Sequence, residues 1–217
     1  MRILFCSSHY PSGGGNSRFI AALAENLATR HDVTVIAPSA SLQALQEQLA
    51  GVRVIRAPVL FGGADPSKSV LAKALYLPMG VAAGKRLLET ESFDIIHAHT
   101  LLPAGRVGDT LGRFANTPNV LSIDDGELVS THGPAEPRAG LLQTWARRLA
   151  RRADCLVCPT ANSASRITEA FGDEINTDVI APDTGAVDDA ARRYEALFEE
   201  VVRRCQRDPV AHGNGAR

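Results

Sequence analysis

The first thirty residues constrain the fold most, because a short apolar run, a glycine triplet and a helical pattern follow one another directly. The apolar run at residues 2–6 predicts a strand that is buried on both faces of a parallel sheet. Gly13, Gly14 and Gly15 allow a tight turn and a close approach of the backbone to a ligand. Asn16 or Ser17 can cap the helix that follows. The stretch therefore predicts a strand, a loop and a helix whose amino end favours a phosphate or carboxylate.

Two common nucleotide-binding motifs do not fit this loop. A dinucleotide fingerprint requires a glycine three residues after Gly15, where Arg18 stands, and an acidic residue after the second strand, which ends in Ile36-Ala37-Pro38. A P-loop requires Gly-Lys-Ser/Thr before the helix, and this sequence lacks it. Two interpretations remain: a glycine loop that binds an unspecified anion, or a turn that only packs the helix on the sheet.

Apolar runs alternate with helical patterns along the rest of the chain. Such alternation predicts an α/β fold with one Rossmann-like, doubly wound parallel sheet of about seven strands, in the order 3-2-1-4-5-6-7. Residues 43–49 are expected to form a short helical stretch ahead of the third strand. A final helix at residues 190–205 is expected to pack back on the sheet, and residues 206–217 to be disordered. The predicted strands are residues 2–6, 31–38, 52–57, 93–97, 119–123, 155–159 and 177–181.

Composition indicates one globular domain, which we place at residues 1–205. The chain has 217 residues, 45% of them hydrophobic, and its formal charge of −1 gives no general attraction to nucleic acid. No apolar run is long enough to span a membrane, and the sequence enters a strand directly after Met1, so we expect a cytoplasmic protein without a signal peptide.

The four cysteines do not resemble the disulfide framework of a secreted protein. Cys155-Leu-Val-Cys158 has the spacing of a redox or zinc motif, but it lies in an apolar run and has no second pair. We expect buried thiols at both positions.

Polar residues follow several of the predicted strands. Ligands of open α/β sheets bind outside the carboxyl ends of the strands, so we expect these residues to form one site. Two histidines and nearby carboxylates could also bind a divalent metal, but nothing supplies a third ligand, and no metal site is predicted. The candidate residues are His9, His97, His99, Asp124, Asp125, Glu127 and Asn162.

A basic segment contains Arg147, Arg148, Arg151 and Arg152, with Trp145 just before it. No acidic residue occurs between Arg138 and Ala153. Such a face can contact the anionic headgroups of a membrane, and the protein would then lie peripherally on the inner face of that membrane. The alternative is a solvated helix face. No nucleic-acid motif accompanies it.

Four sequence landmarks together resemble the N-terminal domain of GT-B-type glycosyltransferases of the group 1, or family 4, class. The resemblance covers roughly residues 1–188. The landmarks are YPSGGGNSRFIAALAENLA, FDIIHAHTLLPAG, RRADCLVCPTANSASRITEAFG and TDVIAPDTGAVD. In this family the N-terminal domain binds the acceptor, and a second Rossmann-like domain binds most of the nucleotide-sugar donor.

The resemblance implies roles for individual residues. Gly13, Gly14 and Gly15 would contact the donor phosphates or the transferred sugar. The acceptor side would include His9, His97, Asp125, Glu127 and Asn162, and the catalytic positions would be His99 and Asp124. Many members have a histidine where Asp124 stands, and a carboxylate can accept a hydrogen bond from a sugar hydroxyl but cannot donate one. The nucleotide sugar is a substrate, so no cofactor is expected.

A larger departure concerns the donor domain. In members of this family, the chain enters the donor domain after the position of Val187-Asp188. The last part of the chain then returns as a helix that packs on the N-terminal domain. Here residues 190–205 resemble the returning helix, joined directly to the first domain. The resemblance thus implies the acceptor-side domain of an enzyme that transfers a sugar to a sugar, polyol or lipid-linked acceptor, with a separate donor-domain chain as partner. The alternative is a non-catalytic, truncated relative that binds or regulates.

Overall fold

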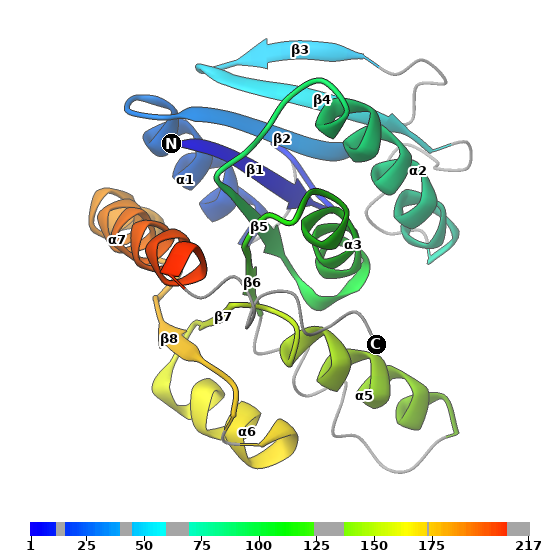
Figure 1. Cartoon of the computed structure of the whole chain (residues 1–217), viewed down its shortest axis with the longest axis vertical. Coiled ribbons are helices and arrows are strands. Elements are labelled where there is room, and N and C mark those ends of the chain that lie inside the picture. Colours follow the sequence, from blue (N-terminus) through cyan, green and yellow to red (C-terminus); the bar gives the residue numbers. More distant parts are fainter. Residues whose placement is uncertain (12–15, 40–44, 60–69, 124–136, 173, 208–217) are drawn as a thin grey trace.

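An open eight-stranded sheet forms the centre of the protein, in the order β3-β4-β2-β1-β5-β6-β7-β8 (Figure 1). The structure is a computed structural model that describes residues 1–11, 16–39, 45–59, 70–123, 137–172 and 174–207. The strands are β1 (Arg2–Ser7), β2 (Asp32–Ser39), β3 (Gln46–Leu49), β4 (Val52–Pro58), β5 (Ile95–His99), β6 (Asn119–Ser122), β7 (Cys155–Cys158) and β8 (Thr177–Val179).

Helices connect the strands. They are α1 (Asn16–Ala28), α2 (Val70–Leu88), the π-helical turn η2 (Leu101–Gly105), α3 (Arg106–Ala115), α5 (Pro137–Ala150), α6 (Ala161–Phe171), the 3-10 turn η3 (Thr184–Ala186) and α7 (Val187–Arg207). Seven of the strands pair in parallel, and their order confirms the predicted doubly wound sheet.

The eighth strand, β3, corrects one prediction. We expected a helical stretch at residues 43–49, but Gln46–Leu49 pairs antiparallel with β4 at the edge of the sheet. The reason lies in the turn that follows. Ala50 and Gly51 both have positive φ, 46° and 83°, and two such residues form the tight hairpin turn that joins antiparallel strands. The turn therefore fixes the preceding residues as a strand.

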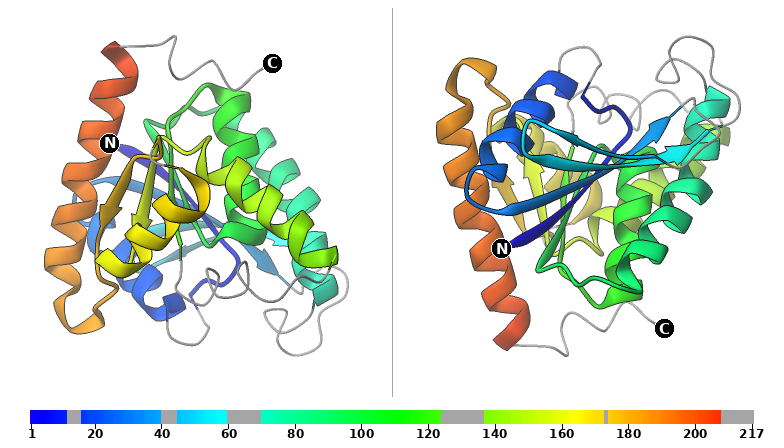
Figure 2. Two further views of the ribbon diagram at one scale, coloured as in Figure 1. Left: turned by 90° about the horizontal axis from the view of Figure 1, so that it is seen from below. Right: turned by 90° about the horizontal axis from the view of Figure 1, so that it is seen from above.

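Helices cover both faces of the sheet (Figure 2). Alternation along β1 sends Ile3 and Phe5 into one core and Leu4 and Cys6 into the other. The first core lies against α1 and α7, and the second lies against α2, α3, α5 and α6. This arrangement explains why the apolar runs of the central strands are continuous rather than alternating.

Small residues bring α3 close to the sheet. A Cβ atom on Gly108 would lie 2.7 Å from the Cβ of Ala98 on β5, which is closer than two carbon atoms can pack. A Cβ atom on Gly105 would lie 2.8 Å from the carbonyl oxygen of Thr100. Glycine at these two positions therefore determines how near α3 and its preceding turn approach β5.

The last helix, α7, packs back on the sheet. Its side chains Tyr194, Leu197, Phe198 and Val201 are buried, and Val202 is partly buried, which confirms the predicted packing. The helix spans Val187–Arg207, slightly longer than predicted. The expected disordered tail otherwise falls at residues 208–217, which lie outside the described residues.

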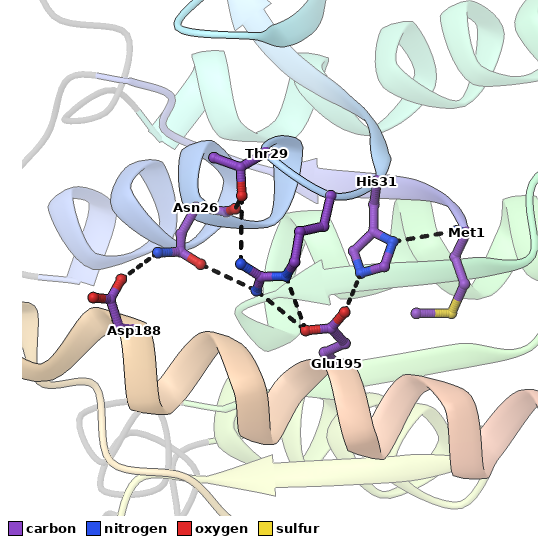
Figure 3. Close-up of polar contacts among 7 residues, drawn as sticks. Met1, Asn26, Thr29, His31, Asp188 and Glu195 are labelled. Atoms are coloured by element: carbon purple, nitrogen blue, oxygen red, sulfur yellow. Dashed lines mark hydrogen bonds and ion pairs between the residues drawn. The ribbon is translucent and has the colours of Figure 1, made fainter.

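A polar seam joins α7 to α1 (Figure 3). Glu195 accepts hydrogen bonds from Arg30 at 3.2 Å and pairs with Nε2 of His31 at 2.7 Å, while Asn26 donates to Asp188. Burial raises the pKa of Glu195, but the hydrogen bonds from Arg30 and His31 outweigh that effect and lower it below its ordinary value. The seam therefore fixes the direction in which α7 crosses α1.

At the other side of α7, two arginines reach the last strands. Arg204 donates to the carbonyl oxygen of Asp154 at 2.6 Å, and Arg193 donates to the carbonyl oxygen of Val179 on β8. The helix thus binds to α1 on one side and to β7 and β8 on the other. No helix among the described residues is long and apolar enough to cross a membrane.

Candidate functional site

The carboxyl ends of β1 and β5 lie side by side and bring predicted site residues together. Ser7, the last residue of β1, pairs with His99, the last residue of β5. The hydroxyl of Ser7 donates to the carbonyl oxygen of His9 at 2.7 Å, which holds the chain as it leaves the strand. His9 and His99 therefore occupy neighbouring positions at one edge of the sheet. Only 7% of the surface of His99 is exposed, whereas His9 is partly exposed.

His97 lies deeper, on the same face of β5 as His99, and it is fully buried, with two aromatic rings of α7 against it. Its ring centroid is 4.8 Å from Phe5, 5.2 Å from Tyr194 and 5.5 Å from Phe198. The ring has no exposed surface, so it is closed to any ligand at the edge while α7 is docked. The proposed contact between His97 and an acceptor stays a prediction, and the structure gives this residue a clear packing role.

A buried polar chain connects His97 to α7. Nε2 of His97 lies 2.7 Å from Oγ of Ser122 on β6, and that hydroxyl lies 3.0 Å from the phenol oxygen of Tyr194. Burial, with a smaller effect from the nearby His99, holds the pKa of His97 well below its ordinary value of 6.5. The imidazole is therefore neutral at physiological pH, and it links three elements through hydrogen bonds.

Thr100, the residue after β5, has a backbone conformation that its side chain disfavours. Its φ is 81°, in a region where a β-branched residue is an outlier. Its N–H donates to the carbonyl oxygen of Ser122, and its own carbonyl oxygen accepts from Gly105, both at 2.9 Å. Strain of this kind is concentrated at functional sites because the surrounding structure must hold it in place. The sequence contained no signal for it.

Tyr10 is a second residue that the sequence analysis did not select. Its ring is buried at the end of β1, and burial, assisted by the negative charge of Glu25, raises its pKa to about 12. Arg56 of β4 donates to the carbonyl oxygen of Tyr10 and pairs with Glu47 of β3 at 2.6 Å. The edge strand that we had predicted as a helix therefore helps to place the start of the loop containing Gly13, Gly14 and Gly15.

Several polar atoms at this edge have no hydrogen-bond partner among the residues that the structure describes. They are buried, and an unpartnered buried polar atom is unfavourable by roughly 1–3 kcal/mol. Hydroxyl and imidazole groups can both donate and accept, which suits a ligand rich in hydroxyl groups. The atoms at the edge are Ser8 Oγ, Tyr10 Oη and Thr100 Oγ1, while His97 Nδ1 is also unpartnered but lies in the enclosed core.

Asn162 lies farther along the same edge of the sheet. It is exposed at the beginning of α6, after β7, so that β6 and β7 separate it from β5. The hydroxyl of Thr160 caps α6 by accepting from the N–H of Ser163 at 3.1 Å. The structure thus places Asn162 at the predicted edge but not beside His9 and His99.

The remaining predicted site residues, Gly13, Gly14, Gly15, Asp124, Asp125 and Glu127, lie outside the described residues. Within the described ranges, no three histidine, cysteine or acidic side chains are grouped to hold a metal ion. Cys155 and Cys158 are buried thiols that form no disulfide, as predicted, and burial raises the pKa of Cys155 to about 12. A thiol with that pKa is protonated and unreactive at neutral pH.

The structure divides the basic segment between two sides of α5. Arg147 and Arg151 donate to the carbonyl oxygens of Ala170 and Phe171 at the end of α6. Arg152 instead reaches Asp109 of α3, with 3.6 Å between the charged atoms. The four arginines therefore do not form one continuous face.

A pocket of about 480 Å³ opens at the opposite, amino-terminal edge of the sheet. It is lined by Met1, Arg2, Ala28, Thr29, Arg30, His31, Asp32 and Asp94. Asp94 accepts from the backbone N–H of Arg2 at 2.7 Å, and Arg30 and His31 bind Glu195. Because these charges satisfy one another, we place the candidate site at the carboxyl edge, where ligands of this sheet type bind.

Comparison with known sequences decides the family. A sequence profile described as a glycosyl transferase 4-like domain matches residues 14–183. The chain belongs to this family. The match of the glycosyl transferase 4-like domain begins in the glycine triplet and ends four residues before α7. No curated protein shows significant similarity to the whole sequence.

Solved structures agree with the fold of the glycosyl transferase 4-like domain. Sucrose-phosphate synthase from Thermosynechococcus elongatus is similar with a TM-score of 0.67 and 19% identity, covering 83% of this chain and 47% of that chain. The present chain thus spans about half the length of that enzyme. A second structure of the enzyme, whose name gives two separate residue ranges, is similar with a TM-score of 0.67 and 17% identity over 92% of this chain and 98% of that one.

Proposed function

We propose that this domain is the acceptor-side part of a glycosyltransferase, which transfers a sugar from a nucleotide-sugar donor to a sugar, polyol or lipid-linked acceptor. The observation that carries the proposal is the short connection between β8 and α7. Only residues 180–186 separate the two elements, yet α7 is docked on α1 and on the last strands. The donor domain that the resemblance leads one to expect at this junction is not inserted between β8 and α7, so a separate donor domain would complete the enzyme.

The second solved structure supports this interpretation of α7. It combines two residue ranges of the sucrose-phosphate synthase chain and is covered almost completely by the present chain. The more complete chain of the same enzyme is covered to only 47%. In our interpretation the first of these ranges corresponds to the residues before α7 and the later range to α7, which would account for the difference between the two coverages.

The acceptor would bind at the carboxyl edge. His99 and the strained Thr100 end β5 there, beside Ser7 and His9 of β1. The unpartnered hydroxyl groups of Ser8 and Tyr10 lie in the same region, and a polyhydroxy ligand would supply the missing hydrogen bonds. His99 would contact the acceptor directly, whereas Tyr194 would act through Ser122 and His97.

Binding of an acceptor can be tested on the isolated chain. We expect methyl glycosides and polyols to shift the amide NMR signals of Ser8, His99 and Thr100, and nucleotide sugars to shift them only weakly. His99→Ala should abolish the acceptor-induced shifts. The matched control is His31→Ala, which removes a histidine at the opposite edge and should leave the shifts intact. Shifts that cluster instead around Thr29 and Asp94 would move the site to the amino edge.

The alternative function is a non-catalytic module that binds a sugar or regulates another protein. Both functions predict acceptor binding, so turnover must distinguish them. Transfer of radiolabelled sugar should occur when a separate donor-domain protein, sought first in adjacent reading frames, is added to the chain. Acceptor binding without turnover in the presence of such a protein would favour the non-catalytic module.

A further inference from the structure

The sheet ends at β3 on one side, and the described part of the chain places no strand beyond it (Figure 1). The view from above in Figure 2 looks onto the hairpin of β3 and β4 that forms this edge. The other edge strand, β8, is held by α7, because Arg193 donates to the carbonyl oxygen of Val179. An open strand edge presents backbone groups with which another strand can pair, so β3 is the edge available for association.

The backbone of β3 turns alternate residues toward β4 and away from it. The N–H of Arg56 donates to the carbonyl oxygen of Leu45 at 2.8 Å, so Leu45 directs its backbone groups toward β4. Alternation in an antiparallel pair directs the backbone groups of Glu47 toward β4 as well. The backbone N–H and C=O groups of Gln46 and Gln48 therefore point outward, to the free side of the edge.

Residues 45–49 read Leu-Gln-Glu-Gln-Leu, a sequence that is the same in both directions. Two such strands can pair antiparallel about a two-fold axis at Glu47. Each Gln46 then lies opposite Gln48 of the other copy, and their outward-pointing backbone groups can exchange hydrogen bonds. Each Leu45 likewise lies opposite Leu49 of the other copy. A shift of the axis by one residue in either direction would instead set Glu47 against a leucine.

The side chains of this segment favour the pairing. Leu45 is 46% exposed, and Leu49 packs partly buried against the first core, so a pair of these leucines extends that core across the axis. Residues 45–49 contain no lysine or proline, which commonly protect an edge strand. Glu47 is their one charged residue, and Arg56 of β4 binds it at 2.6 Å. An arginine therefore offsets the charge of each carboxylate at the axis, where two unpaired glutamates would repel each other.

We propose that a second copy of this chain pairs with β3 through residues 45–49, which gives one continuous sheet across a two-fold axis at Glu47. The paired segment is short, so the dimer is reversible and forms at high protein concentration. Antiparallel pairing makes the parallel strands of the two copies run in opposite directions, so the two candidate sites open on opposite edges of the joined sheet. The inference does not depend on the proposed transferase function.

Sedimentation equilibrium of the full chain measures this association. We expect the weight-average mass to rise from that of one chain toward that of two chains as the protein concentration increases. A two-fold interface is satisfied by two copies, so association should stop there. A native chain that stays monomeric at millimolar concentration, or that continues to associate beyond two copies, would overturn the proposal.

Matched charge changes test which residues face each other. Gln46→Lys with Gln48→Lys sets like charges opposite each other in two places and should weaken dimerisation about fivefold. Gln46→Lys with Gln48→Glu sets opposite charges against each other at the same places, so this variant should dimerise at least as well as the native chain. Both variants lose the hydrogen bond from Gln48 to the carbonyl oxygen of Gly51 at 3.1 Å, which therefore cancels from the comparison. Equal dimerisation of the two variants would contradict the pairing.

Cross-linking tests the position of the axis. Directly opposed residues have Cα atoms about 4.5 Å apart, within disulfide range, so Glu47→Cys should join two chains on mild oxidation. Gln46→Cys alone should not, because its copies are offset along the strands, whereas Gln46→Cys mixed with Gln48→Cys should cross-link. The native chain controls for Cys205, which is partly exposed. Failure of Glu47→Cys to cross-link, or equal cross-linking of Gln46→Cys alone, would show that the axis does not lie at Glu47 and would overturn the proposal.

Discussion

Among single residues, His97 is a titratable group that is wholly removed from water. It is fully enclosed, and burial holds its pKa well below 6.5. Between the folded and unfolded pKa values, the unfolded chain binds more protons than the folded one. The free energy of unfolding should therefore fall as pH decreases below about 6.5, by up to about 1.4 kcal/mol per pH unit from this residue.

Urea denaturation at a series of pH values measures this effect. His97→Gln keeps a polar side chain but cannot titrate, so its free energy of unfolding should depend less steeply on pH below about 6.5. The difference in slope between the two proteins isolates His97 from the other histidines. Parallel curves for His97→Gln and the native chain would show that protonation of this ring does not oppose folding.

Thr100 gives a second prediction at this level. Replacing it by glycine removes the strain of a positive φ, which is about 1–3 kcal/mol, and adds back some flexibility of the unfolded chain. We expect Thr100→Gly to raise the free energy of unfolding by about 1 kcal/mol while weakening acceptor binding. Asn116→Gly is the control, because Asn116 has a φ of 51° that asparagine tolerates, and it should change stability little. A destabilised Thr100→Gly protein would mean that the threonine side chain contributes more than its backbone strain removes.

The two histidines of β5 show what sequence can and cannot predict about a site. Their spacing placed both on one face at the end of a strand, and the structure agrees. It could not reveal that α7, about a hundred residues later, covers His97 and leaves His99 nearer the surface. Burial by a distant element depends on tertiary packing, which local spacing does not encode.

At the level of secondary-structure elements, α7 should contribute strongly to the free energy of unfolding. Phe198 is fully buried and packs against His97 and Tyr194. Phe198→Ala should lower the free energy of unfolding by about 3–5 kcal/mol, the usual range for deleting a buried aromatic side chain. Glu199→Ala, at the next and exposed position, should cost less than about 0.5 kcal/mol. Thermal denaturation followed by circular dichroism compares the two.

Removing the whole helix extends that test. A chain that ends at Asp189 lacks six buried residues of α7, and the four large ones, Tyr194, Leu197, Phe198 and Val201, each contribute roughly 1.5–3 kcal/mol on burial. The sum is comparable to the total stability of a typical domain, about 5–15 kcal/mol. We expect the cooperative melting transition to disappear or to move to a much lower temperature. A truncated chain that melts like the full one would show that α7 is not docked in solution.

The elements also differ in how well their sequences specify them. The central strands β1, β5 and β7 are buried almost throughout, on both faces of the sheet, so their sequence pattern was unambiguous. Gln46–Leu49 has polar, helix-tolerant residues, and its strand conformation comes from the Ala50-Gly51 turn and from pairing with β4. Similarly, Arg147–Arg152 looked like one basic face in sequence, whereas the neighbouring helices α3 and α6 divide its contacts.

For the molecule as a whole, the main prediction concerns activity. Sugar transfer requires the leaving diphosphate, the anomeric carbon and the acceptor hydroxyl to be held together, and one domain supplies only one wall of that arrangement. We expect the isolated chain to show no measurable glycosyl transfer or nucleotide-sugar hydrolysis, as measured by release of radiolabelled sugar. Robust turnover by the chain alone would mean that it contains a donor site of its own.

Gly14→Val then tests the glycine loop in the restored enzyme. A valine side chain would block the approach of the backbone to phosphate, so turnover with an added donor domain should be lost. Circular dichroism should confirm that the variant remains folded, because the loop precedes α1 rather than forming part of the core. Full activity in Gly14→Val would mean that this loop binds no phosphate and is only a turn that packs the helix on the sheet.

The docking of α7 has a consequence for the synthesis of this protein, because the ribosome makes its elements in chain order. β1 is made first and lies in the middle of the sheet, but the helix that covers Phe5 and His97 is made after every strand. Until α7 emerges, the nascent sheet exposes an apolar face that the finished protein hides. Such transiently uncovered surface promotes aggregation and attracts chaperones. The chain is therefore most vulnerable to aggregation from the synthesis of its central strands until α7 has emerged and docked.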